Sequence, residues 1–357
     1  MRRSLPLLPA VLLAASLTAH AQVLVGVNQA WDGGNYGHDL TKSWSLPAWE
    51  RVFDEAHAAK MRSLRVWLFE GMEGVLEDAQ GLPSGVDPGL LDHVDRLADL
   101  AEARGLTVYW TLHDGNLHGS RQDDQRALCT NARGYGDAFR QRVLAPVLAR
   151  LARRPRLVFA IDLLNEAQGS VKAKVWSDGW SGASRYLRTM ACFIHQAAPG
   201  LRVSASSGHG EGVKDVLAGR FDGLGLDFFD VHVYSGGTIP SAAALAVHAR
   251  GQGLPLVLGE CGPNPSSLGA RFIRLFGAKV TANYQRSVLR SFVSEAKRWG
   301  FKAVFPWRLE DAEPLFGLVV DRDARPALEG LADHAGSSRA AAQVPVRRLG
   351  IANRVGQ

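Results

Sequence analysis

Two glutamates stand at the ends of apolar runs in this sequence. Glu166 closes "LVFAIDLLNE", residues 157–166, directly after Asn165, and Glu260 closes "PLVLGE", residues 255–260. Each run is typical of a buried strand, and a buried carboxylate is costly unless it is paired or used in chemistry. Two carboxyl groups that face each other can hydrolyse a glycoside, because one protonates the leaving oxygen while the other attacks the anomeric carbon. The two positions are therefore candidates for a catalytic pair.

Other residues with useful chemistry stand in further apolar runs or at their ends. They are Arg65 in "RVWLF", His113 in "TLHD", His232 and Tyr234 in "VHVYS", and Trp307 in "FPWR". An arginine or a tyrosine that contacts a carboxylate holds it ionised, an amide such as that of Asn165 can hydrogen-bond a sugar hydroxyl, and an aromatic ring can support a sugar face. Simpler alternatives remain for three of them: a core histidine for His113, a structural ion pair for Arg65 and plain packing for Trp307.

A metal site is the other chemistry that this set of residues raises. His113, Asp114, His118 and His232 all lie in or near strand ends. No H-x-H or H-E-x-x-H spacing supports a metal, so we expect neither a metal nor a cofactor. Additional strand-end residues could bind outer sugar hydroxyls, namely Asn28, Glu70, Asp114, His118 and Glu310.

Eight short apolar runs alternate with longer amphipathic stretches. The runs cover 23–28, 63–69, 107–114, 157–166, 201–208, 228–235, 255–262 and 302–311. They are rich in β-branched and aromatic residues and mostly lack strict alternation, which is typical of parallel strands covered on both faces. Eight strand–helix units predict an α/β fold, a single-domain (β/α)8 TIM barrel. An open doubly wound sheet is the alternative, weakened because no G-x-G-x-x-G follows a strand near the N-terminus.

The stretches between the runs carry helix signals. Asp87 is a candidate N-cap, Pro88 takes the first helical position, and Gly105 can end the same helix. Thr281 and Gly300 bracket a second amphipathic stretch in the same way. Weaker patterns predict helices over 47–60, 134–152, 181–198 and 241–251.

The carboxyl ends of barrel strands open into a common mouth, where active sites are built. Glu166 on the fourth run and Glu260 on the seventh are therefore predicted to face each other across that mouth. Residues 115–139 follow the third run and are polar and glycine-rich, which predicts a long loop at the active face.

Both ends of the chain differ from the part between them. Residues 1–21 start with two arginines, continue with an apolar run and end in Ala-His-Ala, which predicts a secretory signal peptide and a mature start at Gln22. Residues 336–357 hold four arginines and little periodicity, which predicts a disordered basic tail after a catalytic domain over 22–335. Without these arginines basic and acidic residues balance, which argues against a nucleic-acid partner. No apolar run is long enough to span a membrane.

The three cysteines are Cys129, Cys192 and Cys261. An odd number argues against a disulfide framework. A single bridge from Cys129 to Cys192 would suit an oxidising compartment, and the alternative for Cys192 is a small buried apolar residue.

The set of strand-end residues resembles the retaining glycoside hydrolases of clan A, above all family 5, the cellulase and mannanase family. The motifs that carry the resemblance are "RVWLF", "TLHD", "LLNE", "VHVYS", "VLGE" and "FPWR", in the family's order over nearly the whole mature chain. The resemblance implies that Glu166 is the acid/base and Glu260 the nucleophile. It implies substrate binding by Arg65, His113, Asn165, His232, Tyr234 and Trp307. The residues after Glu166, "AQG", depart from the family pattern, which has a proline there.

The function predicted from the sequence is a secreted or periplasmic retaining β-glycosidase. It would act as a monomer on a polysaccharide or oligosaccharide of the β-mannan or β-glucan type. Two alternatives are a catalytically inactive glycan-binding barrel and a metal-dependent TIM-barrel hydrolase. The presence of both glutamates weighs against the first alternative, and the second would lose its activity in a chelator.

Overall fold

The structure is a computed structural model that describes most of the region between the two chain ends. The described residues are 23–31, 40–119, 121–208, 210–270, 275, 278–310, 316–320, 323–324, 328 and 331. The predicted signal peptide at 1–21, the mature start at Gln22 and the tail at 336–357 lie outside the described residues. They stay predictions, as do the bounds of the catalytic domain.

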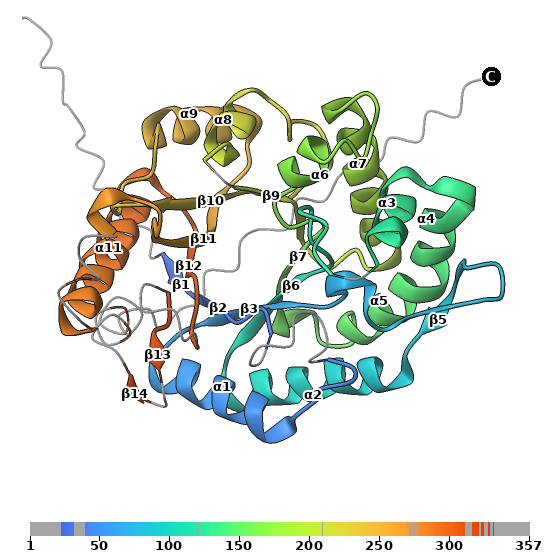
Figure 1. Ribbon diagram of the computed structural model, residues 1–357, viewed down its shortest axis with the longest axis horizontal. Coiled ribbons are helices and arrows are strands. Elements are labelled where there is room, and N and C mark those ends of the chain that lie inside the picture. Colours follow the sequence, from blue (N-terminus) through green and yellow to red (C-terminus); the bar gives the residue numbers. More distant parts are fainter. Residues whose placement is uncertain are drawn as a thin grey trace, which may run out of the picture.

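Parallel strands form the centre of the molecule (Figure 1). They are β1 (Leu24–Val25), β2 (Val27–Asn28), β3 (Ser63–Trp67), β6 (Thr107–Thr111), β7 (Val158–Asp162), β8 (Val203–Ser204), β9 (Ser206–Ser207), β10 (Phe229–Ser235), β11 (Leu256–Pro263) and β12 (Ala303–Pro306). Each predicted run overlaps at least one of them. The sheet orders are β1-β12-β11-β10-β9 and β2-β3-β6-β7-β8, and all these ladders are parallel.

The two sheets join because the chain runs almost directly from β1 into β2 and from β8 into β9. A single residue, Gly26 or Ala205, separates the strands of each pair. The first and fifth strands therefore belong to both sheets, and the strands close into a barrel. The predicted (β/α)8 fold is confirmed, and the open doubly wound sheet is wrong.

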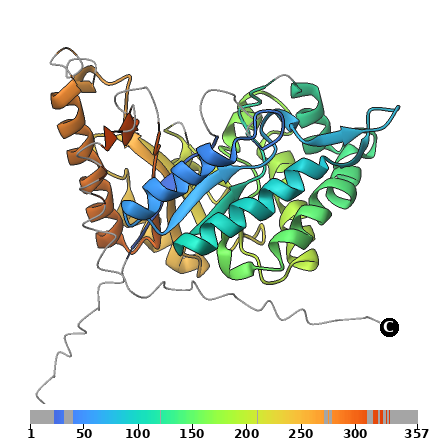
Figure 2. The same ribbon diagram turned by 90° about the horizontal axis from the view of Figure 1, so that it is seen from below.

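Helices surround the barrel on its outer side (Figure 1). They are α1 (Leu46–Ala58), α2 (Pro88–Arg104), α3 (Gln122–Thr130), α4 (Tyr135–Ala138), α5 (Ala145–Leu151), α6 (Gln168–Lys172), α7 (Trp180–Ala197), α8 (Gly212–Leu217), α9 (Ala242–Gln252) and α11 (Ala278–Trp299). Short helical segments are η1 (Glu70–Met72), η2 (Ala132–Gly134), η3 (Phe139–Leu144) and η4 (Pro155–Leu157). Figure 2 shows α1 and α2 side by side across the outer face of the strands. None of the helices in the described ranges has the length and apolar character needed to cross a membrane.

Two antiparallel hairpins lie outside the barrel ladders and were not predicted. They are β4 (Val75–Glu77) with β5 (Pro83–Val86), and β13 (Val319–Val320) with β14 (Asp323–Ala324). Both consist of very short strands, which leave little periodicity in the sequence.

Helix α2 forms as its sequence signals predict. The Asp87 side chain accepts a hydrogen bond from the backbone N–H of Gly89 at 2.7 Å, and Pro88 takes the first helical position. The helix ends at Gly105, whose φ of 64° is the left-handed conformation that glycine adopts without strain. Leu90 and Val94 lie on the face that is buried against the barrel, and burying such a side chain stabilises the fold by about 1.5–3 kcal/mol.

Three sequence predictions about local structure are wrong. Helix α11 begins at Ala278, so Thr281 lies inside its first turns rather than at its N-cap. The segment 115–139 is not one long loop, because α3 and α4 occupy much of it. Cys192 is exposed rather than buried, and Cys129 and Cys192 are both free thiols.

The interior of the barrel is packed in layers. Four aromatic rings, Tyr109, Phe159, Phe228 and Phe305, contact one another with centroids 5.3–6.0 Å apart. The Tyr109 hydroxyl leaves this apolar layer and donates to Asp230 Oδ2 at 2.6 Å. Asp230, His232 and Tyr234 occupy alternate positions of β10, and alternate residues of a strand share a face. The same face of β10 therefore leads from the aromatic layer to the carboxyl ends of the strands.

Candidate active site

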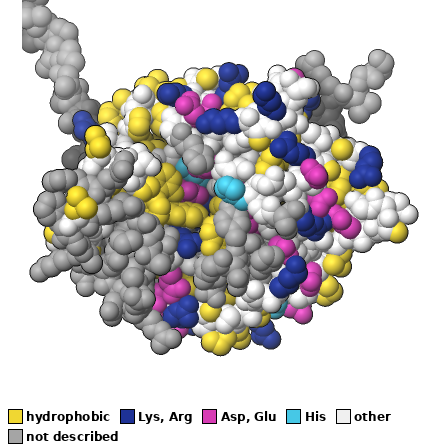
Figure 3. Space-filling view, in the orientation of Figure 1, with side chains coloured by type: hydrophobic (Ala, Val, Ile, Leu, Met, Phe, Trp, Pro, Cys, Tyr) yellow, Lys and Arg dark blue, Asp and Glu magenta, His cyan; other side chains and the backbone are white. Residues whose placement is uncertain are grey.

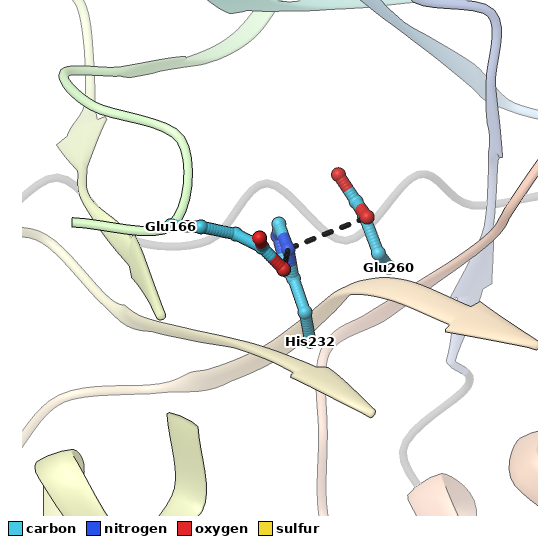
Figure 4. A group of neighbouring side chains, drawn as sticks. All are labelled: Glu166, His232 and Glu260. Carbon is cyan, nitrogen blue, oxygen red and sulfur yellow. Dashed lines mark hydrogen bonds and ion pairs between the residues drawn. The ribbon is translucent and has the colours of Figure 1, made fainter. Parts of the chain in front are cut away.

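Glu166, His232 and Glu260 meet at the carboxyl end of the barrel. One carboxylate oxygen of each glutamate and a ring nitrogen of His232 lie within 4.8 Å of one another, and all three side chains are buried. Figure 4 shows the two carboxylates on either side of the histidine ring. The surface drawn in Figure 3 has histidine and acidic side chains near its centre. The predicted pair on the fourth and seventh strands therefore faces one common space.

Arg65 on β3 forms hydrogen bonds with Glu260 and with other buried polar side chains beside it. Its guanidinium donates to Glu260 Oε1 at 2.8 Å and to Asp162 Oδ2 at 2.6 Å. It also donates to the side-chain oxygens of Asn28, at 3.0 Å, and Asn165, at 2.8 Å. The arginine is fully buried, and the two carboxylates raise its pKa in spite of the opposing effect of burial. The ion pair that the sequence requires for Arg65 is present, with Glu260 as one of two partners.

We expect Arg65→Met to lower the free energy of unfolding by about 3–5 kcal/mol, because it leaves Asp162 and Glu260 buried without their cation. Arg65→Lys keeps the charge but loses the planar fork, so its loss should be intermediate. Urea unfolding at pH 7 measures both. As a control, Arg185→Met removes an exposed arginine paired with Asp178 and should leave stability nearly unchanged. An equally small effect at Arg65 would contradict the assigned role.

Glu260 on β11 is held by three side chains. Tyr234 donates to Oε2 at 2.7 Å, Arg65 donates to Oε1, and His232 Nδ1 lies 3.4 Å from Oε2. Burial raises the pKa of Glu260, and the charges of His232 and Arg65 only partly offset that effect. Arg65 and Tyr234 both lower the pKa of Glu260, as the sequence argument expects, but the effect of burial is larger and the net shift of the pKa is upward.

The ring of His232 lies between the two glutamates. Its Nδ1 is 3.3 Å from Glu166 Oε1 and 3.4 Å from Glu260 Oε2. Burial lowers the pKa of His232. The neighbouring charge of Glu260 and the hydrogen bond to Glu166 raise this pKa by more than burial lowers it, so the net shift is upward. A protonated ring at this position offsets part of the repulsion between two ionised carboxylates.

Glu166 has a backbone conformation that is unusual for a residue with a side chain. Its φ is +50°, and its N–H donates to Ser206 Oγ at 2.9 Å. Strained conformations of this kind cluster at functional sites. Its carboxylate lies directly against Gly208, where a Cβ would be 1.9 Å from Oε1. Asn116 donates to the other oxygen, Oε2, at 2.9 Å.

Asn165, beside Glu166, is fixed at both ends of its amide. Its oxygen accepts from Arg65, and its nitrogen donates to Asp114 Oδ1 at 2.9 Å. These two contacts assign the amide orientation, because Asp114 can only accept and Arg65 can only donate. One amide hydrogen is left over for another acceptor, which is what hydrogen bonding to a sugar hydroxyl requires.

His113 and Trp307 do not contact the glutamates directly. His113 is fully buried, pairs with the hydroxyl of Tyr186 at 2.5 Å, and has its pKa lowered to about 4 by burial. It supports the site through its backbone oxygen, which accepts from the N–H of Asn165 at 3.0 Å. This environment is that of a core histidine, and sugar binding by His113 stays a prediction.

Trp307, which follows β12, belongs to a cluster of three half-buried or buried tryptophans. Its ring lies 6.0 Å from Trp31 and 6.3 Å from Trp67, and Trp31 is 5.5 Å from Trp67. The Arg65 guanidinium lies 5.8 Å from the Trp67 ring, and Arg65 also contacts Glu260. An aromatic ring can support a sugar face, and sugar binding by Trp307 stays a prediction.

Comparisons with known proteins show which solved structures share this fold. The sequence matches no protein-family model and no curated protein, but the fold matches many solved structures. One is a β-1,4-D-mannanase from Cryptopygus antarcticus, with a TM-score of 0.62 and 18% identity over 87% of this chain and 90% of that chain. Another is a β-mannanase from the blue mussel Mytilus edulis, with a TM-score of 0.63 and 18% identity over 91% and 94%.

A third match is GH5_18 from Streptomyces cattleya, solved as a variant in complex with Manb1-4GlcNAc. Its TM-score is 0.62, with 17% identity over 92% of this chain and 83% of that chain. The chain has a glycoside hydrolase family 5 fold. At these identities the comparisons establish the fold, and the chemistry of the site must be argued from its own residues.

Several residues of this candidate site were not assigned from the sequence. Asp162 shares Arg65 with Glu260, while Ser206 links Asp162 to the backbone of Glu166. Asn28, expected only as a contact for outer sugar hydroxyls, instead accepts from Arg65. A signal for Asp162 was present, because an acid within an apolar strand needs a cation and Arg65 was the buried cation available. Ser206 lies in a serine-rich run that carries no such signal.

The remaining strand-end candidates are mostly engaged within the protein. Asn28, Glu70 and Asp114 are buried, and Glu310 pairs with Arg51 at 2.8 Å. His118 Nδ1 lies 2.8 Å from Asp114 Oδ2. Of the four residues considered for a metal, only His232 lies beside both glutamates, and this trio is the one group in the described part of the chain with the spacing of a metal site.

Proposed function

We propose that the protein is a retaining β-glycoside hydrolase in which Glu166 is the acid/base and Glu260 the nucleophile. The observation that carries this proposal is the separation of the two glutamates, which bring one oxygen each within 4.8 Å. A nucleophile must touch the anomeric carbon, for which the carboxyl groups stand about 5–5.5 Å apart, whereas inversion needs roughly 6.5–9.5 Å to admit a water. The short separation supports retention.

The roles follow from the contacts of each glutamate. Glu260 accepts from Arg65 and Tyr234, which suits a group that must be ionised to attack. In the first step its carboxylate bonds to the anomeric carbon, the glycosidic bond breaks, and Glu166 gives its proton to the leaving oxygen. In the second step Glu166 takes a proton from water, the water oxygen attacks the anomeric carbon, and Glu260 is released. Two inversions give net retention.

For the substrate we propose β-1,4-linked mannosides, as polysaccharide or oligosaccharide, with β-glucans as the second candidate. Three solved proteins with this fold are described as β-mannanases or carry a mannose-containing disaccharide. The tryptophan cluster adjoining Arg65 suits a sugar chain. A secreted or periplasmic monomer fits such a substrate, and the predicted signal peptide points to the same location.

A panel of aryl β-glycosides and β-linked polysaccharides tests this function. We expect hydrolysis of β-mannosides or β-mannan, unchanged by a chelator such as EDTA. Glycan binding without any hydrolysis would favour the inactive glycan-binding barrel. Activity that a chelator removes and a divalent cation restores would favour the metal-dependent hydrolase, with Glu166, His232 and Glu260 as the ligands to examine first.

Tyr234→Phe should move the acidic limb of the kcat/KM pH profile to higher pH. The Tyr234 hydroxyl stays protonated because burial raises its pKa well above the usual value, and its donated hydrogen bond favours ionised Glu260. Losing that donor raises the pKa of Glu260 further, so the nucleophile ionises only at higher pH. Tyr135→Phe is the control, because it removes a hydroxyl that donates to Glu77 instead. An unmoved limb in Tyr234→Phe would contradict Glu260 as the group that sets it.

A further inference from the structure

We infer that Asn116 is a positioning residue for the acid/base Glu166, and that Gly169 exists to make room for it. This inference rests on the proposed function and deepens it. Neither residue belongs to the set of strand-end positions on which the resemblance to family 5 depends. Gly169 belongs to the "AQG" triplet in which this chain departs from the family pattern.

Asn116 bridges two carboxylates. It lies in the turn after β6, and its Nδ2 donates to Glu166 Oε2 at 2.9 Å and lies 3.3 Å from Asp114 Oδ1. Two acceptors on one side of the amide identify that atom as the nitrogen, since a carboxylate oxygen can only accept when ionised. Asp114 is fully buried and also accepts from Asn165. One buried carboxylate therefore orients the amides on both sides of the catalytic acid.

The backbone of this turn is locked to the end of the Glu166 strand. Asp114 and Asn165 form a parallel bridge, and the N–H of Gly115 donates to the carbonyl oxygen of Asn165 at 2.6 Å. A Cβ at Gly115 would lie 2.6 Å from the carbonyl oxygens of Asn165 and Glu166. The close approach that only glycine permits fixes the distance between Asn116 and the catalytic carboxylate.

Gly169 provides the space for the Asn116 side chain. A Cβ at position 169 would lie 2.2 Å from Asn116 Oδ1 and 2.9 Å from the carbonyl oxygen of Gly115. The residue before it, Gln168, accepts from the N–H of Gly208 at 3.0 Å, and Gly208 is the residue against which Glu166 Oε1 packs. The "AQG" triplet thus shapes both sides of the Glu166 carboxylate.

This arrangement decides which carboxyl oxygen carries the proton. Oε2 accepts from Asn116, so the proton of protonated Glu166 lies on Oε1. His232 Nδ1, which lies 3.3 Å from Oε1 and 3.4 Å from Glu260 Oε2, then donates to Glu260 instead. Proton transfer to a leaving group depends on such alignment, and a misplacement of about 1 Å can cost on the order of 10²-fold in rate. Losing the Asn116 contact should therefore weaken acid catalysis selectively.

The test compares two substrates that differ only in their need for a proton. An activated dinitrophenyl β-glycoside expels its leaving group unaided, whereas a methylphenyl β-glycoside needs the acid. Asn116→Ala and Gly169→Ala should each lose at least about tenfold more kcat/KM on the methylphenyl substrate than on the dinitrophenyl one. Gln80→Ala, which removes an exposed amide in the turn between β4 and β5, should match the unmodified protein on both.

Glu166→Ala is the reference variant, because its loss of kcat/KM should differ even more between the methylphenyl and dinitrophenyl substrates. Melting temperatures near that of the unmodified protein would show that the variants fold. Equal losses on the two substrates, or no loss, in both Asn116→Ala and Gly169→Ala overturn the inference while Glu166→Ala still behaves as an acid/base variant. No hydrolysis by the unmodified protein overturns the proposed function and this inference together.

Discussion

Glu260→Ala is expected to reduce hydrolysis of a β-glycoside by about 10⁴-fold or more, as removal of a nucleophile does in other covalent mechanisms. The reason is geometric. The Glu260 carboxylate is held against the site by Arg65 and Tyr234, and no other described carboxylate is held in that position. Without it, the covalent intermediate cannot form. Steady-state kinetics on an activated aryl β-glycoside measures the loss.

The same variant should regain activity with a small anion. Removing the side chain opens space beside the anomeric carbon, where azide can attack in place of the carboxylate. The activated substrate should then give an α-glycosyl azide, because a single displacement inverts the configuration. Glu50→Ala removes an exposed glutamate of α1 and should neither lose activity nor respond to azide. A β-azide from Glu260→Ala would exchange the roles of the two glutamates.

Glu166→Ala should give the second large effect, a loss of about 10²–10⁴-fold on substrates with poor leaving groups. An activated aryl substrate should form the covalent intermediate almost as before, since its leaving group needs no proton. The intermediate would then accumulate, because no base remains to activate water. Azide should intercept it and release a β-glycosyl azide, which product analysis by NMR identifies.

An unchanged dependence of activity on the leaving group in Glu166→Ala would contradict the acid/base role of Glu166. If Glu166→Ala lost equal activity on activated and poor leaving groups, Glu166 would act in binding or folding rather than in proton transfer. Unfolding measurements distinguish a role in folding from a role in binding, because a misfolded variant also loses stability.

The residues at the strand ends could be predicted because of one physical regularity. Parallel barrel strands all point their carboxyl ends at the same mouth, so Glu166, Glu260, His232 and Tyr234 could be placed near one another without knowing any distance. The demand of Arg65 for buried carboxylates was equally readable. The structure adds that Asp162 is the second of these carboxylates.

The residues that were missed act through contacts that no local pattern encodes. Asn116 reaches Glu166 only because Gly115 and Gly169 allow two backbones to approach closely. The segment around it, 115–139, was interpreted as a long polar loop, although it contains α3 and α4. Thr281 was interpreted as a cap because capping residues are recognised locally, but α11 already begins at Ala278.

The prediction for His113 shows the limit of residue type as a guide. A histidine at a strand end is equally compatible with a sugar contact and with a core position. Complete burial and the pairing with Tyr186 favour the core position, and neither could be inferred from the sequence around "TLHD".

The stereochemistry of the first product tests the central claim most directly. Proton NMR during early hydrolysis of a β-glycoside follows the anomeric signal of the newly released sugar before it equilibrates. The close approach of Glu166 and Glu260 predicts that the β-anomer forms first and that the α-anomer appears only later through mutarotation. Initial release of the α-anomer would contradict direct attack by Glu260, because inversion requires a water between the two carboxyl groups.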